Sequence, residues 1–136
     1  MVGELKYAQE TYTLTAADAA GTGYVQRNYA PDGIRHGIDA GPGPSYRPQR
    51  WRVHQMTVGL TDANSQAIAG VVVKMGPLHF NGTSFNERQA CAQGLGQAAC
   101  ADVPFECDYG VCWQIHKSLM VAGYIMNVLV VYEVLR

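Results

Sequence analysis

The chain has 136 residues, of which 48% are hydrophobic and only 15% are charged. This length is typical of one domain, and a charge share below the usual ~25% indicates that a neighbouring molecule covers part of the surface. The ten basic and eleven acidic residues nearly balance, and only Arg47, Arg50 and Arg52 form a basic cluster. Because phosphate binding requires clustered Lys and Arg, we expect no nucleic-acid partner.

The first 29 residues predict two strands that are separated by a single helical turn. Tyr and Thr, which favour strands, are frequent in residues 5–15 and 24–29. Between these segments, Thr15 and Asp18 have the spacing of a capping box, and Gly21 would end the turn.

Residues 31–48 predict a long irregular arm, because closely spaced Gly and Pro residues neither hold a helix nor donate into a ladder. In a small domain, a loop of this length is usually functional or held against a partner. We expect four residues in and after this arm to contact a partner, since Tyr, Trp and Arg most often anchor interfaces. These four are Tyr46, Arg47, Arg50 and Trp51. A disordered tether is the alternative.

The centre of the chain predicts two further strands. Residues 51–60 alternate in a period of two, and residues 62–65 form a turn cluster. Residues 67–75 indicate a strand that is buried on both faces, which Gly76-Pro77 would break. A short continuation at 78–80 precedes the tight-turn dipeptide Asn81-Gly82.

The last third predicts one short helix and two strands. Asn86 can cap a helical turn over residues 86–92, and residues 111–119 alternate like a strand. The final strand would cover residues 121–135, with a bend at Gly123. This apolar end is shorter than the roughly 20 residues of a membrane helix and is rich in Val, so we expect no membrane span.

These elements together predict an all-β fold. Seven or eight strands with little helix and no βαβ rhythm favour a single-domain antiparallel β-sandwich or jelly roll over residues 1–136, with one or two short helical turns.

Four cysteines lie within 22 residues of one another: Cys91, Cys100, Cys107 and Cys112. Their spacing fits no common zinc module. Cys112 and His116 also lie roughly 13 Å apart on a regular strand, at about 3.3 Å per residue, which is too far for two ligands of one metal. We therefore expect no metal site.

Disulfides fit the cysteine spacing better than a metal does. Four cysteines allow three pairings, and turn-rich segments lie between Cys107 and Cys112 and between Cys91 and Cys100. We expect these two bridges in mature material, with reduced thiols in a cytosolic protein as the alternative.

The sequence contains no pattern that is typical of a catalytic or cofactor site. It has no nucleophile elbow, no phosphate-binding loop and no paired carboxylates, and its four histidines are isolated. We expect no enzymatic activity, no catalytic residue and no cofactor.

From Arg50 onward, about two thirds of the chain resembles small jelly-roll virion proteins of tailed bacteriophages, such as head-decoration and minor capsid or tail proteins. Four segments carry the resemblance: residues 50–58, 71–73, 81–84 and 128–134. The clustered cysteines depart from it, because such proteins are often poor in cysteine. The resemblance implies a structural subunit of an extracellular virion, as a homo-oligomer or bound to the major capsid protein or another virion protein.

Physical arguments that do not depend on the resemblance also favour an assembly subunit. Low charge, a Gly- and Pro-rich arm and an apolar terminal strand are typical of a chain with extensive interfaces. The alternative is a lectin-like β-sandwich that binds carbohydrate, because eight tyrosines and two tryptophans could provide stacking surfaces. Such a protein would bind glycans as an isolated monomer.

Overall fold

A computed structural model of the chain describes residues 4–29, 50–68, 73–78, 90–92, 97–117 and 120–135. Within these residues the chain forms nine strands and one helical turn, which confirms the all-β prediction. The elements are β1 (Leu5–Thr13), α1 (Ala16–Ala19), β2 (Tyr24–Tyr29), β3 (Trp51–Thr61), β4 (Val73–Pro77), β5 (Ala90–Ala92), β6 (Gln97–Cys100), β7 (Phe105–Cys107), β8 (Val111–His116) and β9 (Ile125–Val134).

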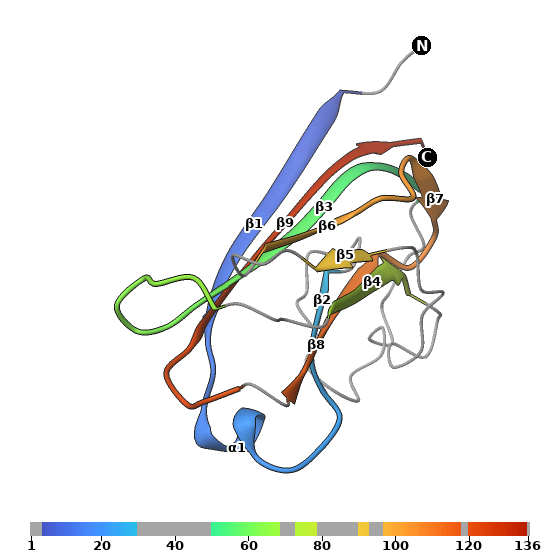
Figure 1. The fold of residues 1–136 in the computed structure, drawn as a ribbon. Helices are drawn as coiled ribbons and strands as arrows, with labels where there is room; N and C mark the ends of the chain where they lie inside the picture. The colour runs from blue at the N-terminus through green and yellow to red at the C-terminus, as the bar shows by residue number, and fades with distance from the viewer. Residues whose placement is uncertain are drawn as a thin grey trace.

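The strands form two antiparallel sheets that pack against each other, as predicted for a β-sandwich (Figure 1). The larger, six-stranded sheet has the order β1-β9-β3-β6-β5, with β7 paired to one end of β3. The smaller sheet has the order β2-β8-β4. Among the described strands, β1 therefore lies at one edge of the larger sheet, and only β9 pairs with it.

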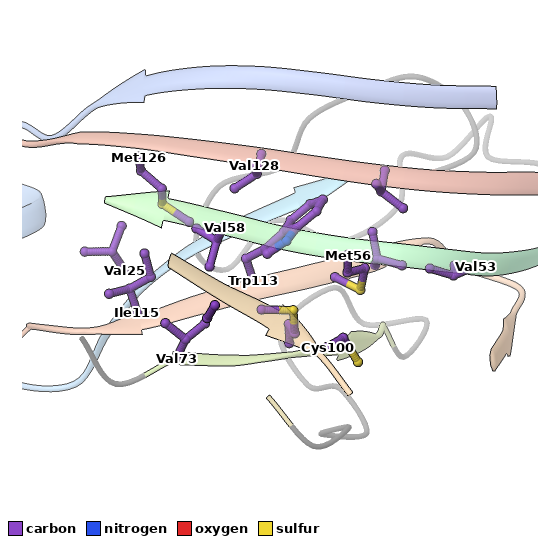
Figure 2. Packing of buried hydrophobic residues seen from close by; sticks show 14 of the residues in the cluster. Val25, Val53, Met56, Val58, Val73, Cys100, Trp113, Ile115, Met126 and Val128 are labelled. Atoms are coloured by element: carbon purple, nitrogen blue, oxygen red, sulfur yellow. The ribbon is translucent and has the colours of Figure 1, made fainter. Parts of the chain in front are cut away.

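The core fills the space between the sheets because alternate residues of each strand point inward. From β9 and β3 come buried side chains that include Met126, Val128 and Met56, and these face Trp113 and Ile115 of β8 (Figure 2). All five belong to one hydrophobic cluster that extends across both sheets.

Aromatic rings close the core at the end of the sandwich where β9 finishes. The rings of Trp51 and Tyr132 are stacked with their centroids 4.1 Å apart, and the Tyr29 ring lies 5.8 Å from Trp51. Trp51 and Trp113 are both only 1% exposed. Such rings contribute large buried areas, and the stacking adds to their effect.

The predicted capping box is confirmed at the start of α1. The Thr15 hydroxyl accepts a hydrogen bond from the Asp18 backbone N–H at 3.2 Å, and the Asp18 carboxylate accepts one from the Thr15 N–H at 2.8 Å. The Tyr12 hydroxyl also donates to Asp18 at 2.7 Å, which fixes the helical turn against β1. Gly21 follows the turn with a φ of +80°, a conformation that glycine adopts readily.

Two local predictions were wrong. Gly76-Pro77 does not break the strand, because β4 continues through both residues to its end. A proline is tolerated there because β4 is an edge strand of its sheet, so the missing N–H costs no ladder bond. Residues 90–92 form β5 instead of a helix, since they pair with β6.

Other predictions differ from the structure only in extent, or lie outside the described residues. The last strand begins at Ile125, because Gly123 lies in the preceding turn with a φ of +94°. The strands β6 and β7 were not predicted, as both are very short. The arm at 31–48 and the turn at Asn81-Gly82 lie outside the described residues.

Candidate functional site

The outer face of the six-stranded sheet carries rows of side chains that cross several strands. Period-two alternation places Gln9 of β1, Leu129 of β9 and Thr57 of β3 on this face, and the register aligns them in one row that continues to Ala99 of β6. None of these four residues is fully buried. This row therefore presents apolar and uncharged polar side chains to the outside.

A groove of about 530 Å³ runs over this outer face, within the size range of small-ligand sites. Its lining has no charged side chain: Gln9, Gln55, Thr57, Val58, Gly59, Leu60, Thr61, Ala67, Ala98, Ala99, Asn127, Val128 and Leu129. The Thr11 hydroxyl donates to Asn127 Oδ1 at 2.7 Å, which fixes the orientation of this amide. The groove thus offers neutral hydrogen-bonding groups.

The edge of this face at β1 is the most exposed part of the sheet. Leu5 is 59% exposed and Tyr7 is 76% exposed, although both are large hydrophobic residues on a regular strand. Lys6 between them is exposed as well, so the first half of β1 is open on both faces. In Figure 1, β1 lies along the outside of β9 with no labelled strand on its other side. Exposed, regular edges of this kind are templates for pairing with another strand.

Arginines at the Leu5 end of the sheet are bound by acidic residues, and the register places Leu5, Glu133 and Arg52 in one row. Arg50 Nε lies 2.8 Å from Glu106 Oε1, and Arg50 Nη1 lies 3.2 Å from Asp108. Arg52 Nη2 is 3.2 Å from the second Glu106 oxygen. The hydrogen bond from Arg50 holds the pKa of Glu106 below its usual value, and the same bond raises the pKa of Arg50. These contacts offset the charges of Arg50 and Arg52, the two described arginines of the basic cluster.

Glu133 joins this charged end to β9. Its side chain is only 5% exposed, and its Oε1 atom lies 3.0 Å from His54 Nε2 and 3.6 Å from Arg52 Nη1. A carboxylate this buried requires such partners. The three side chains thus form a polar network that joins β3 to β9.

A second ion pair lies beneath the β1 edge, between the two sheets. Arg27 of β2 points inward with Val25, and its guanidinium pairs with the carboxylate of Glu10 on β1. The same guanidinium lies 4.1 Å from the centre of the Tyr12 ring, in a cation–π arrangement. The two charged side chains are 17% and 20% exposed, so this pair fastens β1 to the smaller sheet in a largely desolvated place.

The outer face of the smaller sheet carries a ladder of amide side chains. Gln114 Nε2 donates to Gln26 Oε1 at 2.7 Å, and Gln26 Nε2 donates to Asn28 Oδ1 at 2.9 Å. Beside the ladder, the Tyr24 and His116 rings form a T-shaped pair with their centroids 5.1 Å apart. This ladder was not predicted, although the alternation of polar residues at 24–28 and 112–116 is visible in the sequence.

Neither of the two predicted disulfides is present, because Cys100, Cys107 and Cys112 are thiols. Cys107 packs in the core between the sheets, whereas Cys112 lies on the other face of its strand from Val111 and Trp113. Cys107 and Cys112 are therefore close in sequence, but their side chains lie on different sides of the smaller sheet. The Cys91 side chain lies outside the described part of the chain, and the backbone pairs Cys91 with Ala99 instead of Cys100.

The four predicted interface residues have different positions. Tyr46 and Arg47 lie outside the described residues. Arg50 lies at the surface in the ion network, and Trp51 is buried in the core, where it stacks on Tyr132. The side chain of Trp51 thus contributes to folding, and of the two described residues Arg50 is the one that a partner could reach.

Within the described residues, no group of three or more His, Cys, Asp or Glu side chains could hold a metal ion. The helical turn in the same part of the chain is too short to cross a membrane.

Comparison with protein-family models, curated proteins and solved structures gives no match to this chain.

We predict that Glu10→Gln lowers the free energy of unfolding by about 2 kcal/mol, because it leaves the largely buried Arg27 charge without its counter-charge. The matched control is Glu106→Gln, which removes an exposed carboxylate from the surface network and should cost less. Urea denaturation of the two variants measures the difference. A Glu106→Gln loss as large as that of Glu10→Gln would contradict a structural role for the buried pair.

We also predict that Cys107 and Cys112 resist alkylation in the native protein. Burial raises the pKa of Cys107 to about 12 and raises the pKa of Cys112 as well, so neither thiol forms the reactive thiolate near neutral pH. Iodoacetamide labelling followed by peptide mass spectrometry should find both unmodified without denaturant and modified in urea. Rapid native labelling, or a disulfide-linked peptide in unreduced material, would show that this assignment is wrong.

Proposed function

We propose that this protein is a non-enzymatic structural subunit of a larger assembly, and that the β1 edge with the adjoining outer face of the six-stranded sheet forms its contact surface. The single observation that carries the proposal is the exposure of Leu5 and Tyr7 on a nine-residue edge strand. Natural edge strands are usually short, covered, interrupted by a bulge or proline, or guarded by charged side chains. Over its nine residues β1 has no bulge and no proline, and its charged side chains are Lys6 and Glu10.

The composition supports the same proposal. A 15% share of charged residues is low for a solitary domain, and the described arginines of the basic cluster are already engaged with acidic neighbours. A surface with few unpaired charges is easier to desolvate when a partner binds.

The assembly that we would test first is a virion, in which the chain would serve as a capsid-decoration, minor capsid or tail protein. The support is the likeness in style of the segments from Arg50 onward to small jelly-roll virion proteins. An antiparallel β-sandwich is compatible with this role, although many other functions use the same architecture.

A second candidate is carbohydrate binding, which the neutral groove favours. Its amides and hydroxyls, from Gln9, Gln55, Thr57 and Asn127, are groups that can hydrogen-bond to sugar hydroxyls. The exposed Tyr7 lies on the same face of β1, two residues before Gln9, and could stack on a sugar ring.

We predict that a chain with a C-terminal tag, produced in its native host, sediments with a particle much heavier than a monomer. Leu5→Lys should release it to the top of the gradient, because a charge at this position would have to be desolvated at the contact. Val121→Lys is the matched control, since Val121 is 53% exposed at a distant turn; this variant should sediment as the unsubstituted chain does.

A chain that remains monomeric in its host would contradict the assembly function. If that monomer bound an immobilised glycan and the Gln55→Ala variant did not, carbohydrate binding would replace the assembly function as the proposed function. Equal sedimentation of the Leu5→Lys variant and the unsubstituted chain would show that the contact lies elsewhere on the molecule.

A further inference from the structure

The backbone of β1 offers a regular set of hydrogen-bonding groups on its open side. In an antiparallel ladder, alternate residues direct both N–H and C=O toward the same neighbour. Because β1 pairs with β9 without a register shift from Leu5 to Thr13, about half of its nine residues direct these groups away from the sheet. A strand that adds at this edge therefore meets an uninterrupted partner.

The charges on β1 restrict which strand can add there. Lys6 and Glu10 lie on the same face of β1, and Ala8 lies midway between them. Glu10 is already paired with Arg27, so a neutral strand would leave only the Lys6 charge without a complement at the new contact. A strand with an acidic residue opposite Lys6 and a basic residue opposite Glu10 would satisfy both.

A second copy of β1 meets this requirement in one register. When two copies pair antiparallel with Ala8 on the two-fold axis, Lys6 faces the partner's Glu10, and the symmetry repeats this pair on the other side of the axis. The ammonium group of the partner's Lys6 would then contact the Glu10 carboxylate, which already pairs with Arg27. Glu10 would thus lie between two cations.

On the outer face of β1, the register that centres on Ala8 also covers the exposed hydrophobic residues. Tyr7 lies opposite the partner's Gln9 and diagonal to the partner's Tyr7, at a separation of about 7–8 Å that aromatic side chains can bridge. Leu5 lies opposite the partner's Thr11. The two most exposed large side chains of the strand thus come to lie within the contact.

Neighbouring registers lack this complementarity. With Tyr7 on the axis, Lys6 would face the partner's Ala8, and with Gln9 on the axis it would face the partner's Tyr12. In each of these registers Lys6 faces a neutral residue, whereas Glu10 keeps its contact with Arg27. The charge pattern therefore selects the register that centres on Ala8.

We propose that the partner at the β1 edge is a second copy of this chain, paired antiparallel about a two-fold axis at Ala8, so that the six-stranded sheets of two subunits become continuous. This inference rests on the proposed assembly function and specifies its first contact.

Cysteine cross-linking distinguishes the registers. In a Cys91→Ser background, single variants Tyr7→Cys, Gln9→Cys and Thr11→Cys place a thiol on the outer face of the strand. Directly opposed residues have Cα atoms about 4.5–5.5 Å apart, within the range of a disulfide, whereas diagonal ones are too far apart. A mixture of Tyr7→Cys and Gln9→Cys, after subunit exchange and mild oxidation, should give several-fold more covalent dimer than either variant alone.

Two control samples, one single variant and one mixture, test the other registers. Tyr7→Cys alone would cross-link best if Tyr7 lay on the axis, and Tyr7→Cys with Thr11→Cys would do so if Gln9 lay there. Either result, or the absence of covalent dimer from all mixtures of variants whose thermal unfolding matches that of the background, would overturn the Ala8-centred pairing. If the chain still sedimented with a heavy particle in its host, the assembly function would stand while this contact failed.

Discussion

The long antiparallel pairing of β3 with β9 is the interaction on which the rest of the structure depends. These two strands pair from Trp51 and Val134 to Thr61 and Ile125, with one irregularity near His54. Their inner faces supply much of the hydrophobic core, and their outer faces form the floor of the groove. Among the described strands, β1 joins the sheet through β9, β6 and β7 join it through β3, and β5 joins it through β6. Loss of this pairing would therefore remove the core and the candidate contact surface together.

The same ladder explains why the candidate surface lies at β1. Each strand that pairs with β9 or β3 bonds to one row of backbone N–H and C=O groups and has a second row on its other side. Among the described strands, the series ends at β1 on one side. Beneath this edge, the Glu10–Arg27 pair holds β1 onto the smaller sheet, so the strand stays regular although its first half is exposed. A rigid strand loses less conformational entropy when it pairs with a partner than a disordered one would.

Much of the fold could be predicted from local patterns, whereas the candidate surface could not. Alternation identified β3 and β8, and the spacing of Thr15 and Asp18 identified the capped turn, because these signals lie within a few residues. The rows on the outer face depend on the register of β1 with β9, which are more than 100 residues apart in sequence, and no local pattern encodes it. The cysteine prediction was wrong because closeness in sequence does not show on which face of a sheet a side chain lies.

Hydrogen exchange at single-residue resolution tests most directly the claim that the β1 edge is closed by another strand in the assembly. In a dilute monomer, the β1 amides bonded to β9 should be protected, and the alternate amides that point away should exchange rapidly. In the assembled material, the account predicts slow exchange at both sets of β1 amides. Rapid exchange of the outward-pointing amides in the assembly, at the rate measured in the monomer, would contradict it.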